Sequence, residues 1–235
     1  SELIPVARAN GITHSLIVPM GGTISGVSGL ITLDGWGIEE MAIVQKVALH
    51  IWWPGQGLSI PNHNSEGKSI EEQKKERIKN IEDLDEFFNQ AEAYKRSRLA
   101  APKSKTDLNP SWEAMLPFVS RKLPLVIHAD EKRQIVSALD WAEKRKYKII
   151  ISGGRDSWKI AERIAAMQVP VIYRHVFSAP PQTNLAHDIH FRAPGILTRA
   201  GVELSIGLRL GAWSAANQRN LPYHAAHAIP LGLKR

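Results

Sequence analysis

From residue 123 to residue 173 the chain alternates between short apolar runs and segments in which apolar residues recur at helical spacing. The apolar runs are 123–129 (LPLVIHA), 148–152 (KIIIS) and 169–173 (VPVIY). Strands that recur at short, regular intervals, each followed by a helix, need crossover connections, and such connections join parallel strands. This stretch therefore predicts the parallel sheet of an α/β protein.

Three further runs read as strands, at 12–19, 47–53 and 202–207, which gives six in all. Six strands of this kind fit part of a TIM-type (β/α)8 barrel or a doubly wound open sheet, and periodicity alone does not choose between them. We expect residues 1–235 to form a single α/β domain.

Cap and turn signals place the helices and loops between these strands. Ser69 is followed by Glu72 three residues later, which is the pattern of a capping box and predicts the start of a long helix. Asp130 is predicted to cap the helix that follows the run at 123–129. Polar and glycine-rich stretches predict loops at 21–29, 54–68 and 101–109.

Composition narrows the class of protein. Hydrophobic residues make up 43% of 235, and no apolar run approaches the about 20 residues that span a bilayer, so we expect no membrane partner. The chain has no signal-peptide pattern and no cysteine, which excludes disulfides and thiolate metal sites and leaves the compartment open. The net charge of +7 is spread along the chain, which favours a solvated surface over a nucleic-acid interface.

The predicted strands end in residues that can carry chemistry. His128 ends the first run, Gly153 and Gly154 follow the second, and Arg174 and His175 follow the third. In parallel α/β folds ligands bind at the carboxyl ends of the strands. These ends are therefore the predicted functional site.

Several stretches resemble the metal-dependent amidohydrolase superfamily, in its imidazolonepropionase-related branch. In chain order they are residues 10–19 (NGITHSLIVP), 21–29 (GGTISGVSG), 33–36 (LDGW), 48–54 (ALHIWWP), 123–130 (LPLVIHAD), 152–154 (SGG), 169–172 (VPVI), 200–207 (AGVELSIG) and 219–222 (RNLP). Each motif is short, and their order over most of the chain carries the resemblance.

The resemblance implies a hydrolase that acts on a non-peptide C–N bond of an amide or cyclic amide. A divalent ion of the zinc type would activate the attacking water, and His128 stands where the superfamily has a metal ligand. The chain also departs from that pattern. No strand ends in His-x-His, Ser152-Gly153-Gly154 replaces a ligand histidine, and Ile206-Gly207-Leu208-Arg209 replaces a terminal aspartate. The resemblance therefore implies that residues 1–235 are a single barrel-derived domain of the catalytic type, incomplete at both ends, and that the chain is the middle of a longer protein or a shortened relative.

Each candidate residue has a second interpretation. His128 is either a metal ligand or a partly buried histidine bonded to a backbone carbonyl. His175 either reaches a substrate or is a loop histidine. Arg174, Arg209 and Arg219 either bind an anionic substrate or are exposed arginines at loop starts. The whole chain is either a hydrolase or a non-catalytic domain that binds a small molecule or a partner. Because an incomplete barrel leaves open sheet edges, we expect a homo-oligomer or further chain segments that close the ring.

Overall fold

The computed structural model of the chain describes residues 2–57, 68–100 and 108–233. A six-stranded sheet has the order β2-β5-β6-β7-β8-β9, with strands β2 (Ile24–Val27), β5 (Leu49–Trp52), β6 (Leu125–Ala129), β7 (Ile149–Gly153), β8 (Val171–Tyr173) and β9 (Leu204–Ile206). A three-stranded antiparallel sheet has the order β1-β3-β4, with strands β1 (His14–Ile17), β3 (Gly29–Thr32) and β4 (Ala42–Val44).

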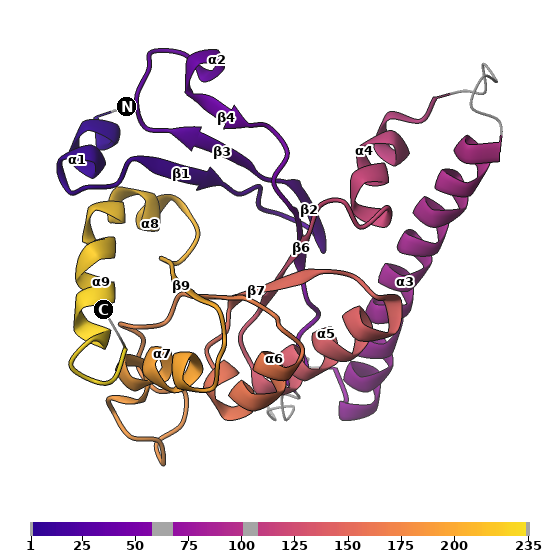
Figure 1. Cartoon of the computed structure of the whole chain (residues 1–235). Coiled ribbons are helices and arrows are strands. Elements are labelled where there is room, and N and C mark those ends of the chain that lie inside the picture. The colour runs from indigo at the N-terminus through magenta and orange to yellow at the C-terminus, as the bar shows by residue number, and fades with distance from the viewer. Residues whose placement is uncertain (1, 58–67, 101–107, 234–235) are drawn as a thin grey trace.

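The described helices are α1 (Leu3–Ala9), α2 (Ile38–Met41), α3 (Ile70–Ala100), α4 (Pro110–Val119), α5 (Lys132–Arg145), α6 (Ala161–Ala166), α7 (Ile189–Arg199), α8 (Ala212–Ala216) and α9 (Leu221–Ala228), with 3-10 turns at Ser157–Ile160 and Gln218–Asn220. In Figure 1 helices α5, α6 and α7 lie on one side of the parallel strands, and strands β1, β3 and β4 lie on the other. Among the helices that the structure describes, none has both the length and the apolar character to cross a bilayer.

The winding of the six-stranded sheet identifies the fold class. Strands β5 to β9 are parallel and follow one another in space in the order of the sequence. A doubly wound sheet reverses its strand order at a switch point. The described sheet has no such reversal, so the chain is an α/β protein with part of a TIM-type barrel. The alternative of a doubly wound open sheet is therefore wrong.

Two predictions at the amino end of the chain were wrong. The strand predicted at 12–19 exists as β1, but it pairs with β3 in the small antiparallel sheet and not with the parallel strands. The stretch 21–29, predicted to be a loop, contains β2, which pairs antiparallel with β5 through a bulge between Ile24 and Gly26. Glycines on both sides of a four-residue strand, and inside it, hid its period of two.

The cap predictions had mixed outcomes. The Ser69–Glu72 capping box is present: the Glu72 N–H donates to Ser69 Oγ (3.2 Å) and the Ser69 N–H donates to Glu72 Oε2 (2.8 Å). Asp130, by contrast, does not cap α5. The helix has Glu131 at its N-cap, and Gln134 Oε1 accepts from the N–H groups of Asp130 and Glu131. The predicted loops at 54–68 and 101–109 lie mostly outside the described residues.

The two faces of the parallel sheet differ in composition. Alternate residues of β5, β6 and β7 belong to one apolar core beneath the helices, namely Leu49, Ile51, Leu125, Ile127, Ile149 and Ile151. The intervening residues face the other side, which corresponds to the interior of a barrel and is called the lumen face below. Its residues include His50, Trp52, His128, Ser152 and Arg174, and they form the candidate site.

Candidate functional site

Two buried histidines lie side by side on the lumen face. His50 Nδ1 and His128 Nε2 are 2.9 Å apart, and the Trp52 ring stacks on the His128 ring at a centroid distance of 4.2 Å. His50 comes from β5 and His128 from the neighbouring strand β6, where it pairs in register with Trp52. The alternative in which His128 bonds a backbone carbonyl is therefore wrong, because its partner is another imidazole.

Burial keeps both imidazoles neutral. Desolvation, reinforced by the charge of Arg174, lowers the pKa of His50 to about 4. Desolvation and the charges of Arg174 and His50 lower the pKa of His128 to about 3, against the opposing charge of Asp130. In each neutral ring one nitrogen donates and the other accepts. The outer nitrogens, His50 Nε2 and His128 Nδ1, are shielded from solvent and have no hydrogen-bond partner in the described structure.

A carboxylate and a third histidine meet at the ends of β6 and β8. His175 Nε2 lies 2.7 Å from Asp130 Oδ1, and His175 Nδ1 lies 3.0 Å from Ser178 Oγ. Although burial raises the pKa of Asp130, the hydrogen bond from His175 and the charges of His175, Arg174 and Arg155 together hold that pKa below its usual value. An ionised carboxylate accepts hydrogen bonds, so it fixes the His175 tautomer with the proton on Nε2.

Arg174 is the positive charge of this cluster. Its side chain runs from β8 across the carboxyl edge between two glycines. A Cβ at Gly207 would lie 3.2 Å from Arg174 Cγ, and a Cβ at Gly153 would lie 3.1 Å from Arg174 Nη2 and would clash with Asp130 Oδ1. Gly153 also has φ +107°, which disfavours any side chain. The two glycines therefore make room for the guanidinium group.

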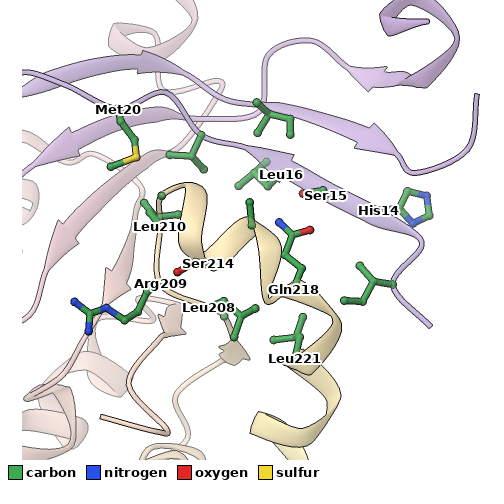
Figure 2. Close-up of a pocket in the computed structure, with 16 residues that line it drawn as sticks. His14, Ser15, Leu16, Met20, Leu208, Arg209, Leu210, Ser214, Gln218 and Leu221 are labelled. Carbon is green, nitrogen blue, oxygen red and sulfur yellow. The ribbon is translucent and has the colours of Figure 1, made fainter. Parts of the chain in front are cut away.

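A cavity of about 510 Å³ lies between β1 and the segment that follows β9. Figure 2 shows Leu16 and Met20 on one side of it and Leu208 and Leu210 on the other, with Arg209 at its margin pointing away from α8. Gly207 also lines the cavity, and the would-be Cβ of Gly207 touches the Arg174 side chain. The cavity therefore adjoins the polar cluster at Arg174.

The residues present do not by themselves fit a catalytic metal ion. A zinc site of that kind takes three protein ligands and leaves one position for water. His50 and His128 offer two nitrogens, but no group of three or more His, Cys, Asp or Glu side chains within the described ranges could hold an ion. Ligation of a metal by His128 therefore stays a prediction, and any further ligand would come from outside the described residues.

The structure brings together three of the four residues selected from the sequence. His128, Arg174 and His175 gather at the carboxyl edge, whereas Arg209 is exposed and lines the adjoining cavity. Sequence reasoning missed His50, although a histidine inside the otherwise apolar run Ala48–Ile51 is a signal of a polar lumen position. It also gave Asp130 the role of a cap.

These features define a class of protein: a barrel-type α/β domain with ionisable side chains gathered where its parallel strands end. One solved structure with this fold is the crystal structure of an amidohydrolase from Thermotoga maritima MSB8, with a TM-score of 0.80 and 19% identity, covering 100% of this chain and 60% of that one. The likeness establishes the fold, and this chain spans about three-fifths of that protein's length. No protein-family profile and no curated protein matches the chain.

Proposed function

We propose that this chain is an amidohydrolase-type hydrolase, related to the imidazolonepropionase branch, that cleaves a non-peptide C–N bond in a small amide or cyclic amide. The observation that supports it best is the pair of Asp130 Oδ1 and His175 Nε2, 2.7 Å apart at the carboxyl edge of the barrel-type sheet. The fold shared with a solved amidohydrolase supports the same reaction class.

Hydrolysis of an amide removes a proton from water and supplies a proton to the departing nitrogen. His175 is suited to both transfers, because Asp130 holds the Nε2 proton and leaves the Nδ1 lone pair available. In the present structure Nδ1 faces the Ser178 hydroxyl, which an attacking water would replace. The imidazolium that forms is stabilised by the Asp130 carboxylate and then donates its proton to the leaving nitrogen.

A metal-dependent form of the reaction remains part of the proposal, with His128 and its neighbour His50 as the nitrogens available for a zinc-type ion. The described residues supply no third ligand to complete such a site. Elemental analysis of the purified protein and of His128→Ala tests this part separately. A divalent metal bound in about equimolar amount by the parent protein and lost in the variant would support it.

The test of the reaction is hydrolysis of a panel of small amides and cyclic amides, followed by mass spectrometry. We expect His175→Gln to reduce kcat by about 100-fold to 10,000-fold and to change the pH profile. His187→Gln removes an exposed histidine outside the cluster and is the matched control. A parent protein that hydrolyses none of the panel, or a His175→Gln variant with full activity, would contradict the proposal.

A second candidate is a non-catalytic domain that binds a small molecule or a partner at the same strand ends. This candidate is favoured because His50 and His128 offer two nitrogens to a metal ion and the described residues supply no third ligand. In either case strands β2 and β9 are the two edges of the six-stranded sheet. We therefore propose a homo-oligomer, or additional chain segments, that pair with these edges, and sedimentation of a stable monomer would count against the oligomer.

A further inference from the structure

Exposed apolar side chains gather on and around the small antiparallel sheet. Six of the described residues with large exposed hydrophobic side chains lie between positions 17 and 44, namely Ile17, Met20, Trp36, Ile38, Ile43 and Val44. In Figure 1 helix α2 and strand β4 lie on the side of this sheet that faces away from α8 and α9. Exposed apolar side chains that gather in one region mark an interaction surface.

This surface contains a hollow, called the β4 hollow below. Its volume is about 550 Å³. Sites that enclose small molecules run from about 300 to 1,000 Å³, so the hollow has room for an indole ring. Its apolar lining comes from all three strands of the small sheet and from α2, and includes Ile17, Ile31, Ile38, Ala42 and Val44.

Trp36 is presented beside the β4 hollow with its side chain in solvent. Its exposed fraction is 100%, and Ile38, two residues later, lines the hollow. The turn that carries Trp36 is held at both ends. The Trp36 N–H donates to Glu40 Oε2 (3.0 Å), and Arg8 Nη1 donates to Asp34 Oδ1 (2.9 Å). A tryptophan on an ordered turn loses little freedom on binding and is suited to anchor an interface.

The order of charges along β4 indicates what covers this surface. Glu39 precedes β4 and borders the hollow, Lys46 follows β4, and both side chains are exposed. A two-fold axis reverses the direction of β4 in a second copy, so the acidic end of each copy meets the basic end of the other. The register between β3 and β4 shifts next to Ile43, and such a bulge disfavours pairing of one β4 with another. The contact is therefore made by side chains.

We propose that two copies of this chain associate about a two-fold axis, with Trp36 of each copy in the β4 hollow of the other and Glu39 facing Lys46 across the contact. The arrangement is self-complementary, because anchor and hollow lie on the same surface and one contact is made twice. This surface lies apart from the carboxyl edge and from the edge strands β2 and β9. The inference therefore goes beyond the proposed hydrolysis and does not depend on it.

The experiment is sedimentation velocity of the protein over a concentration series, which gives the dissociation constant of the dimer. We expect the unaltered protein to form a dimer and Trp36→Ala to weaken it at least about thirtyfold, as for an anchoring side chain of an interface. Trp213→Ala is the matched control, because Trp213 is 85% exposed on α8, outside the hollow. It keeps the dissociation constant of the unaltered protein. Because the Trp36 side chain is in solvent, Trp36→Ala also keeps the circular dichroism spectrum of the fold.

Charge reversal tests the two-fold arrangement itself. At low ionic strength Glu39→Lys weakens the dimer by about twofold to fivefold, and the double variant Glu39→Lys, Lys46→Glu restores it. A double variant no tighter than Glu39→Lys overturns the inference.

Two further outcomes overturn it. An unaltered protein that sediments as a monomer at every concentration leaves the hollow to another occupant. A dimer equally tight in Trp36→Ala and in the unaltered protein assigns association to the edges of the six-stranded sheet. Since sedimentation measures no reaction, each of these results is distinct from failure of the proposed hydrolysis.

Discussion

Ile151 and Ser152 are neighbours in β7, and their side chains lie on opposite faces of the same sheet. Ile151 is fully buried in the apolar core with Ile51 and Ile127. Ser152 faces the lumen beside His128, with which it pairs in register. The helix-side face is filled by side chains that fit one another, whereas the lumen face holds imidazoles and a guanidinium with unused hydrogen-bonding atoms. One face therefore stabilises the fold, and the other retains groups that are available to a ligand.

The largest expected effect tests whether the helix-side face contributes more to stability than the lumen face. Ile151→Ala deletes buried methyl groups from the core and should lower the free energy of unfolding by about 2–5 kcal/mol. Ser152→Ala removes a hydroxyl group that has no hydrogen-bond partner among the described residues, and should cost less than about 1 kcal/mol. Urea denaturation of both variants measures the difference. Equal losses would mean that the lumen face is packed as a second core.

The glycine at the end of β7 tests how closely the lumen side chains approach the backbone. Gly153→Ala places a Cβ against Asp130 and Arg174 at a positive φ, and should destabilise the protein by about 1–3 kcal/mol. It should also displace Asp130 from His175, which NMR of the His175 ring would detect. Gly37 has no atom within 4 Å of its would-be Cβ and no positive φ, so Gly37→Ala should have little effect.

The sequence predicts the strands of the sheet better than it predicts the polar contacts on the lumen face. The apolar runs at 123–129, 148–152 and 169–173 each contain a parallel strand, because strands buried within a parallel sheet have nearly continuous apolar sequences. The pairing of His50 with His128 is not encoded locally, since it depends on the register between β5 and β6. Asp130 could serve as a cap or as a partner for His175, and only the position of β8 decides between them.

The neutral histidine pair predicts a pH dependence of stability. The folded-state pKa values of His50 and His128, about 4 and about 3, lie below the ordinary value of 6.5. Between pH 6.5 and 4 the unfolded chain binds more protons, so the free energy of unfolding falls as the pH is lowered through this window. Each histidine contributes up to about 1.4 kcal/mol per pH unit.

The double variant His50→Gln, His128→Gln should therefore show a shallower decrease when the free energy of unfolding is measured between pH 7 and 5. His190, whose pKa is also lowered to about 4, remains in both proteins and keeps part of the slope. His187→Gln serves as the comparison, because it removes an exposed histidine and should leave the slope as in the parent protein. Identical slopes for the parent and the double variant would mean that the pair is solvated.

The smallest expected effect is the change in the free energy of unfolding when Arg174 is replaced. The sign of this change is more informative than its size. Arg174→Met replaces a partly buried cation, for which the described residues supply no hydrogen-bond or ion-pair partner, with an apolar side chain of similar length. Removal of the desolvation cost should raise the free energy of unfolding by about 1 kcal/mol in the absence of ligand. Arg133→Met, on the exposed surface of α5, should change it by less than about 0.5 kcal/mol. A loss of stability in Arg174→Met would mean that the guanidinium supports the fold, and the lumen face would then share the structural role of the helix-side face.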